Sequence, residues 1–146
     1  MDRTQLIAEI VEDMASMRRV AWGHGGTKPL KRKLTHAQMG IVCMLTHAGP
    51  QYLKDLAARL QMTPSAATQL VNGLERNHLV TRSSDPNDRR KIRLALTSLG
   101  KRMMARAHQE RMKSFTALLA PLTDAELRQW SALQRKIIAQ KSSSHV

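Results

Sequence analysis

Residues 84–97 read SDPNDRRKIRLALT, and this stretch decides how the rest of the chain is interpreted. It opens with a cluster of turn-forming residues and continues into an alternating apolar series: Ile92, Leu94 and Leu96. Alternation of this kind predicts a strand that packs one face on a core. The stretch therefore predicts a β-hairpin with strands at about 79–82 and 91–96. Four cations lie on or beside its turn: Arg89, Arg90, Lys91 and Arg93.

The residues directly before this hairpin predict two helices joined by a tight turn. The first spans about 53–60, and the second begins where Thr63 can cap it and Pro64 falls at the first helical position. The second helix has one apolar face, which is expected to be buried: Ala67, Leu70, Val71 and Leu74. The opposite face carries short, uncharged side chains: Ser65, Ala66, Thr68, Gln69 and Asn72.

Two short helices followed by a basic hairpin predict a winged helix-turn-helix. In that motif the second helix enters the major groove of DNA, and the hairpin lies beside the same duplex. The positive end of the helix favours phosphate, and small polar side chains can approach base edges closely. Many amphipathic helix pairs only pack a core, which is the alternative interpretation. The basic hairpin favours the DNA-binding one.

Further helices are predicted on both sides of this central segment, so the fold class is mainly α. The apolar spacing places them at about 4–21, 35–48, 97–119 and 123–140. Two of them begin with the spacing of a capping box: Thr35–Gln38 and Thr123–Glu126.

Composition and charge restrict the possible partners. The chain has 146 residues, of which 42% are hydrophobic and 3% aromatic, as suits a single helical domain. The formal net charge is +13, and residues 28–113 hold 17 Lys/Arg against 5 Asp/Glu. Because the excess is concentrated in the central segment, the expected partner is an anionic polymer or surface.

The segment LKDLAARLQMTPSAATQLVNGLERNHLVTRSSDPNDRRKIRLALTSLG, residues 53–100, resembles the DNA-binding core of the MarR family of bacterial transcriptional regulators. The similarity is strongest at DPNDRRKIRLALTSLG. The resemblance implies one domain over 1–146, with a winged helix-turn-helix lobe at 34–97 and N- and C-terminal dimerisation helices at 1–22 and 98–141. It also implies a homodimer that binds a pseudo-palindromic double-stranded DNA operator, as a repressor relieved by a small-molecule ligand.

The same resemblance assigns roles to individual residues. Arg90 would reach into the minor groove, and Asp88 would hold Arg90 or its neighbours in place. The expected DNA-binding residues are Thr63, Pro64, Ser65, Ala66, Thr68, Gln69, Asp88, Arg89, Arg90 and Lys91. Two positions depart from the family pattern: Gln69, where arginine is frequent, and His78, where glycine is usual at a helix end that needs a positive φ.

Other classes of protein have less support. A sequence-independent, architectural DNA-binding protein is the main alternative, because phosphate contacts alone supply non-specific affinity. The sequence has no nucleophile elbow, P-loop or glycine-rich phosphate loop, so we expect no enzyme activity, no catalytic residues and no cofactor. The six histidines lack the spacing of metal ligands, so no metal site is expected.

Two features leave alternatives open. Cys43 is either a small buried hydrophobe or an oxidant sensor, and the lack of a cation beside it in the sequence favours the inert interpretation. The nine methionines are either adaptable core or the lining of a ligand cavity, so the effector site is unassigned. No signal peptide or membrane-spanning run occurs, and we expect a cytoplasmic protein that does not bind membranes.

Overall fold

The computed structural model describes residues 1–22 and 34–142 of the chain. It contains two compact units, one made of Met1–Gly23 with Ala107–Val146 and the other of His24–Arg106. Most of the described residues are helical, and the strands form one small antiparallel sheet. The predicted fold class, mainly α with a winged helix-turn-helix, is confirmed.

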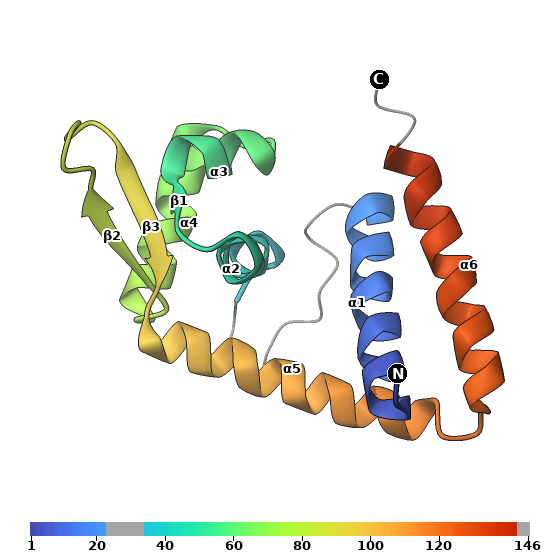
Figure 1. Ribbon diagram of the computed structural model, residues 1–146. Coiled ribbons are helices and arrows are strands. Elements are labelled where there is room, and N and C mark those ends of the chain that lie inside the picture. The colour runs from blue at the N-terminus through green and yellow to red at the C-terminus, as the bar shows by residue number, and fades with distance from the viewer. Residues whose placement is uncertain (23–33, 143–146) are drawn as a thin grey trace. The chain divides into compact units, whose positions relative to one another are not determined.

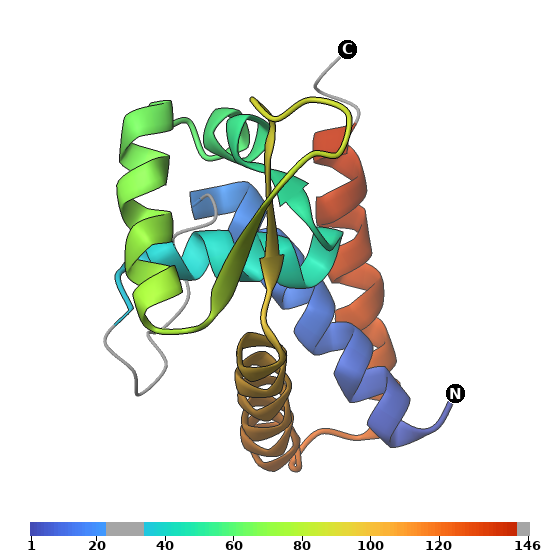
Figure 2. The same cartoon turned by 90° about the vertical axis from the view of Figure 1, so that its left-hand side faces the viewer.

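The unit His24–Arg106 holds the helix-turn-helix and the wing (Figure 1). Its elements are α2 (His36–Ala48), β1 (Gln51–Tyr52), α3 (Leu53–Arg59), α4 (Pro64–Arg76), β2 (Val80–Ser84), β3 (Ile92–Leu96) and the start of α5 (Ser98–Leu118). Helices α3 and α4 form the helix-turn-helix. The wing is residues 80–96, and Figure 2 shows its two strands running together to the loop at 85–91.

The sheet has three strands in the order β1-β3-β2, where the sequence predicted two. The missed strand, β1, is only two residues long and pairs Tyr52 with Arg93. The first predicted strand was also too short, because pairing continues to Ser84 opposite Ile92. Serine is common in turns, so the sequence pattern assigned Ser83 and Ser84 to the turn although the ladder with β3 keeps them extended.

The predicted helix starts are confirmed in detail. Thr35 and Gln38 form a complete capping box at α2, with each side chain accepting from the other residue's backbone N–H. At α4 the Thr63 hydroxyl accepts from the N–H of Ala66 at 3.1 Å, and Pro64 occupies the first turn. These N-terminal caps provide hydrogen-bond acceptors for backbone N–H groups that a helix end leaves without partners.

Both helices of the helix-turn-helix end on a residue with positive φ. His78 after α4 has φ 57°, as the family pattern predicted, and Gln61 after α3 has φ 52°. In each case two backbone bonds close the helix end, for example from Leu79 N–H to Leu74 O at 3.0 Å and from His78 N–H to Glu75 O at 2.8 Å. This is a Schellman motif, which turns the chain sharply towards the next element.

The core of this unit is apolar and joins the helices to the sheet. Its fully buried side chains include Ile41 and Val42 from α2, Leu56 from α3, and Leu74 from α4. Leu94 of β3 is also 0% exposed, and Ile92 and Leu96 pack against the same cluster. The predicted alternation along β3 therefore does anchor the wing.

The base of the wing is joined to α5 through two neighbouring carbonyl groups. The Thr97 hydroxyl donates to His78 O at 2.6 Å and accepts from Gly100 N–H at 3.0 Å, so Thr97 caps α5. The Thr97 N–H donates to Leu79 O at 3.0 Å. A Cβ at Gly100 would lie 2.4 Å from the same Leu79 oxygen. The approach of α5 to this carbonyl therefore requires glycine.

The other unit consists of α1 (Arg3–Trp22), the end of α5 and α6 (Asp124–Ser142). Helices α1 and α6 lie side by side (Figures 1 and 2). They bury one apolar cluster: Leu6, Ile7, Ile10, Val11, Leu119 and Leu127. The second predicted capping box is present, because Thr123 N–H donates to Glu126 at 2.7 Å and Glu126 N–H donates to the Thr123 hydroxyl at 3.3 Å.

Arg3 ties the start of α1 to the turn between α5 and α6. Its guanidinium donates to the carbonyl groups of Leu119 and Leu122, at 3.1 and 2.9 Å, and pairs with Asp124 at 2.6 Å.

Within residues 1–22 and 34–142, no helix is long and apolar enough to cross a lipid bilayer.

We expect Gly100→Ala to lower the free energy of unfolding by about 1–3 kcal/mol, because the new methyl group would be forced against a backbone oxygen. Gly73→Ala is the matched control in α4. There a new Cβ would have as its nearest atom, at 2.5 Å, the flexible end of the Gln38 side chain. The gain in helix propensity, about 1 kcal/mol, should offset most of the cost of moving this side chain, whose oxygen accepts from Thr35 N–H in the capping box of α2, so the net loss should be smaller than at Gly100. Chemical denaturation measures the free energy of unfolding of both variants, and equal losses at the two sites would contradict the proposed clash.

Candidate nucleic-acid interface

The exposed face of α4 carries most of the residues that the sequence assigned to the major groove. Thr63, Pro64, Ser65 and Gln69 are exposed, while Ala66 and Thr68 are half-buried. Thr63 is the N-cap of α4, and the other five lie on its first two turns. The face has no charged side chain, so it offers hydrogen-bonding groups and small apolar groups.

The N-terminus of α4 has fewer free backbone donors than a helix end usually has. Pro64 has no N–H, Ala66 N–H is bonded to the Thr63 hydroxyl, and Ala67 N–H is bonded to Thr63 O at 3.0 Å. Ser65 N–H is therefore the one first-turn amide with no acceptor among the described residues. An anion at this helix end would meet that single amide and the positive end of the helix dipole.

Two polar side chains of α4 have partners within the protein. The Thr68 hydroxyl donates to Pro64 O at 2.9 Å, so its oxygen can accept a hydrogen bond but its proton is already engaged. Asn72 accepts a hydrogen bond from Arg82 of β2, and the Arg82 Nε lies 2.9 Å from Glu75 Oε2. Arg82 thus joins the second half of α4 to the wing. Ser65 and Gln69 remain the residues of this face with unengaged polar side chains among those described.

The loop of the wing is organised by the carboxylate of Asp85. Its Oδ1 accepts from the N–H groups of Asn87 and Asp88, at 2.8 and 3.2 Å. Its Oδ2 accepts from the hydroxyl of Tyr52 at 2.5 Å. Two backbone bonds close the loop, from Asp85 N–H to Lys91 O and from Lys91 N–H to Asp88 O, both at 2.9 Å.

Asp88 supports Arg90 through the backbone. Its Oδ1 accepts from Arg90 N–H at 3.0 Å, which agrees with the expectation that it holds Arg90 or a neighbour in place. Arg89, Arg90 and Lys91 are all exposed. Among the described residues, no carboxylate forms an ion pair with Arg89 or Arg90. Both guanidinium groups can therefore meet an external anion without first leaving an internal one.

Lys91 has a contact inside the protein. Its ammonium nitrogen lies 6.0 Å from the centre of the Tyr52 ring, at the outer limit of a cation–π interaction. Tyr52 and Asp85 were not assigned to the site from the sequence. They lie 33 positions apart, and no local spacing predicts that they meet.

The Tyr52–Asp85 hydrogen bond shifts the pKa values of both side chains. The bond from the Tyr52 hydroxyl, followed by the N–H of Asn87, holds the pKa of the Asp85 carboxyl below its usual value. The same bond raises the pKa of Tyr52. The carboxylate therefore stabilises the fold fully above about pH 3.9, and this contribution is lost as the pH falls through the lowered pKa. The tyrosine contribution is complete below about pH 10 and is lost as the pH rises through the raised pKa.

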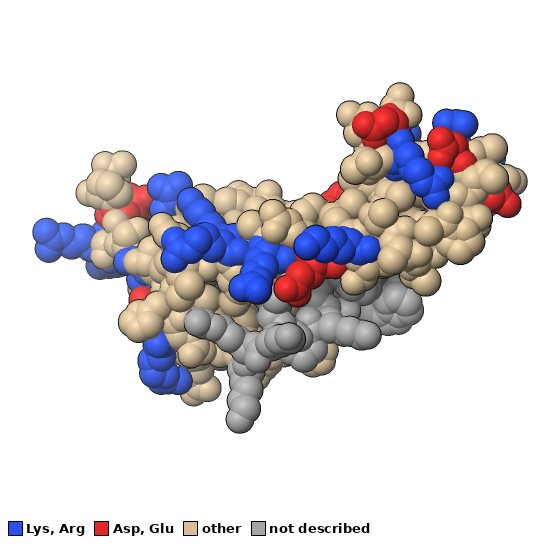
Figure 3. Space-filling view, turned by 90° about the horizontal axis from the view of Figure 1, so that it is seen from below, with Lys and Arg blue, Asp and Glu red and all other residues tan. Residues whose placement is uncertain are grey.

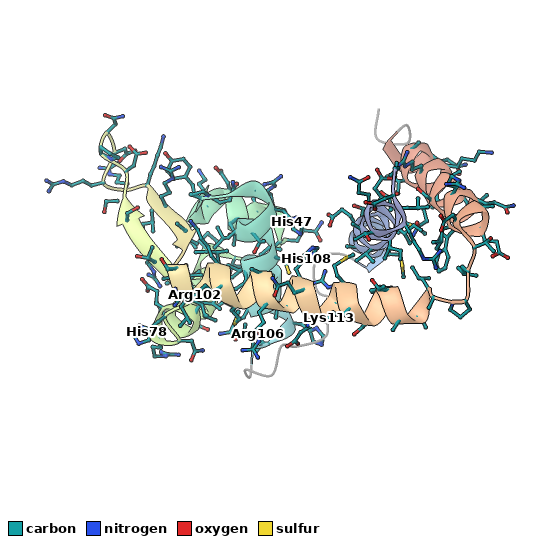
Figure 4. The ribbon with its side chains drawn as sticks, turned by 60° about the horizontal axis from the view of Figure 1, so that its bottom comes forward. His47, His78, Arg102, Arg106, His108 and Lys113 are labelled. Atoms are coloured by element: carbon teal, nitrogen blue, oxygen red, sulfur yellow. The ribbon has the colours of Figure 1, made fainter. Side chains whose placement is uncertain are left out.

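A second group of cations lies on α5, away from the wing loop. Figure 3 shows Lys and Arg side chains gathered along this helix, and Lys101, Arg102 and Arg106 are exposed. Figure 4 labels Arg102 and Arg106 on the outer side of α5. In this unit the wing loop and the start of α4 lie at the opposite end from α5 (Figure 1). These cations are thus suitable controls for the charge of the wing.

The structure also bears on two other features considered from the sequence, the cysteine at position 43 and a metal site. Cys43, the single cysteine of the chain, is half-buried on α2 and packs against the apolar core. Among the described residues, no three His, Cys, Asp or Glu side chains are arranged to hold a metal ion.

Comparisons with known proteins agree with this geometry. Residues 34–92 match the model of the MarR family. The chain is 29% identical to the HTH-type transcriptional repressor MdtR of Bacillus subtilis (strain 168), over 73% of this chain and 69% of that protein. It is 28% identical to the homoprotocatechuate degradative operon repressor of Escherichia coli, over 75% of this chain and 74% of that protein.

Solved structures show the same fold. The YusO protein of Bacillus subtilis is 26% identical, with a TM-score of 0.56 over 97% of this chain and 86% of its own. A MarR-like transcriptional regulator of Thermotoga maritima is 23% identical, with a TM-score of 0.66 over 97% of this chain and 98% of its own.

The hydrogen bond at Asp85 can be tested by titration. We expect the side-chain carboxyl carbon of Asp85 to titrate below about pH 3.9 by NMR, and to titrate at higher pH in Tyr52→Phe, because that change removes the largest cause of the shift. Glu126 is the control, since its pKa is lowered by the backbone N–H and hydroxyl of Thr123. An identical Asp85 titration in both proteins would show that the bond does not form.

Proposed function

The chain belongs to the MarR family of transcriptional regulators, and we propose that it acts by binding double-stranded DNA in a sequence-specific manner as a homodimer. The observation that carries the proposal is the wing loop, which exposes Arg89 and Arg90 without an ion pair to any carboxylate among the described residues, in the same unit as an uncharged, exposed face of α4. Helix α4 would lie in the major groove and the wing at the adjacent minor groove.

The two surfaces would have different tasks. Gln69 can form a bidentate pair with an adenine edge, and Ser65 can donate or accept. Ala66 and the Thr68 methyl group can pack against a thymine methyl. The wing arginines would meet phosphate and the negative potential of a narrow minor groove. Bases would thus be recognised mainly by α4, and affinity would come largely from the wing.

The homodimer is supported by an uncovered apolar face in the unit of α1 and α6. Leu133 and Ile137 of α6 are both 53% exposed. They lie in a groove of about 540 Å³, lined by Met17, Leu122, Glu126, Gln129, Trp130, Leu133, Gln134 and Ile137. A second copy would cover this face and place two α4 helices on the two halves of a pseudo-palindromic operator.

Repression, rather than activation, is the proposed mode of action. The relatives from Bacillus subtilis and Escherichia coli are both named as repressors. Relief by a small-molecule ligand is also proposed, on family membership alone. A compound that raises the thermal stability of the protein and releases it from its operator would meet this part of the proposal.

Sequence-specific and architectural binding can be separated at Gln69. We expect Gln69→Ala to weaken binding to the operator, recovered by selecting genomic fragments on the protein, by about 1–3 kcal/mol. Binding to random DNA should change much less, because phosphate contacts are retained. Gln109→Ala, an exposed change on α5, is the matched control. Equal losses on both DNAs, or no preferred fragment, would favour the architectural protein.

The wing is tested by salt dependence. Arg90→Ala removes one cation per subunit, so the slope of log affinity against log salt should flatten by about 1.8 for a dimer. Arg90→Lys should restore most of the slope but less of the affinity, because a guanidinium is planar and more weakly hydrated. Arg102→Ala removes the same charge from α5 and should leave the slope nearly unchanged. Matching slopes for wild type and Arg90→Ala would exclude a wing contact.

The dimer is tested by sedimentation. Wild type should sediment at twice the chain mass of 16.4 kDa at micromolar concentration, and Leu133→Glu should shift it to the monomer, because the new charge would be buried in the interface. Ala132→Glu adds the same charge at an exposed position of α6 outside the groove and should leave the dimer intact. A monomeric wild type, or an unaffected Leu133→Glu dimer, would refute this interface.

A further inference from the structure

Tyr52 lies where β1 ends and α3 begins, so it belongs to the start of the helix-turn-helix. Its backbone pairs with Arg93 of β3, and its half-buried side chain extends beyond this pair to the wing loop. There the hydroxyl donates to Asp85 Oδ2, and Lys91 lies over the ring. One side chain therefore contacts both ends of the loop 85–91.

The loop has few other ties to the rest of its unit. The β2–β3 ladder ends at the pair Ser84–Ile92, and the β1–β3 ladder ends at Tyr52–Arg93. Apart from these pairs and the Tyr52 bond, the hydrogen bonds of the loop are internal within the described part of the chain: Asp85 and Asp88 accept backbone N–H groups of the loop, and Asp85 and Lys91 close it. Among the described residues, Tyr52 is the side chain that joins this self-contained loop to the helix-turn-helix.

We propose that Tyr52 is a positioning residue for DNA binding, which holds the wing loop in register with α4 through Asp85. This inference rests on the proposed function. The Asp85 carboxylate transmits the position, because one oxygen bonds Tyr52 and the other bonds the backbone that leads to Arg89 and Arg90. A loop held in this way loses less conformational entropy when its arginines bind DNA.

The alternative is that Tyr52 only stabilises the fold. The two roles predict different effects of a Tyr52 substitution on DNA binding by the wing arginines. Tyr52→Phe keeps the ring against β1 and Lys91 and removes only the hydroxyl, so no phosphate-binding charge is lost. A positioning role predicts lower operator affinity with an unchanged salt slope, whereas loss of a direct contact such as Arg90 flattens the slope.

The experiment is a double-mutant cycle on the selected operator duplex, using the full chain. We expect Tyr52→Phe to weaken binding about three- to tenfold, which corresponds to ordering one or two side chains. In an Arg90→Ala background the same change should have a smaller effect than in wild type, because one of the two arginines that it positions is absent. Thr46→Val is the control, since it removes a hydroxyl that donates to Val42 O on α2, outside the proposed interface.

Each outcome has one meaning. Unaltered operator affinity of Tyr52→Phe, or an equal loss with and without Arg90, would overturn the positioning role while leaving the proposed function intact. Failure of wild type to prefer any fragment, together with an inert Arg90→Ala, would instead overturn the proposed function. If thermal unfolding shows that Tyr52→Phe does not fold, Asp85→Asn weakens the same bond while keeping an oxygen for the loop N–H groups, and the same non-additivity is expected.

Discussion

The winged helix-turn-helix of this chain depends on two consecutive carbonyl groups, those of His78 and Leu79. Both are bonded by Thr97, which follows β3 and caps α5, so one threonine joins the end of α4, the base of the wing and the start of α5. This bonding explains two otherwise unfavourable residues. His78 has a strained, positive φ, yet it brings its carbonyl to Thr97. Gly100 lies inside a helix, where alanine would be preferred, yet a Cβ would meet Leu79 O at 2.4 Å.

The aspartates within the basic wing have a related explanation. A carboxylate beside Arg89 and Arg90 could have neutralised them. Asp85 instead accepts from two backbone N–H groups and the Tyr52 hydroxyl, and Asp88 accepts from the N–H of Arg90. The acidic residues thus bond backbone and phenol donors and shape the loop, and among the described residues neither forms an ion pair with the exposed Arg89 or Arg90. The sequence pattern of acids followed by cations is therefore one structural unit.

Local features could be predicted from the sequence, and distant pairings could not. The caps at Thr35, Thr63 and Thr123 follow from spacings of three residues, and the strand at 92–96 follows from alternation. Strand β1 was missed because two residues carry no periodicity, and its partner strand lies beyond the whole helix-turn-helix in the sequence. The same reason hid the contact between Tyr52 and the wing loop. The bonds of Arg82 to Asn72 and Glu75 were missed although these residues are close in the sequence, because they cross from a strand to a helix and follow the periodicity of neither.

In the candidate site, too, the sequence predicted where side chains lie on a helix face but not which hydrogen bonds they form. The sequence placed Thr68 and Asn72 on the exposed face of α4, but it could not show that the Thr68 proton is bonded to a backbone carbonyl or that Asn72 is held by β2. A helix surface offers only the polar groups that the protein does not itself use. Ser65 and Gln69 on α4 and the arginines at 89–90 on the wing retain their full capacity among the described residues. In the proposed complex, base recognition therefore rests on few side chains, and correct placement of α4 and the wing relative to each other matters as much as the contacts themselves.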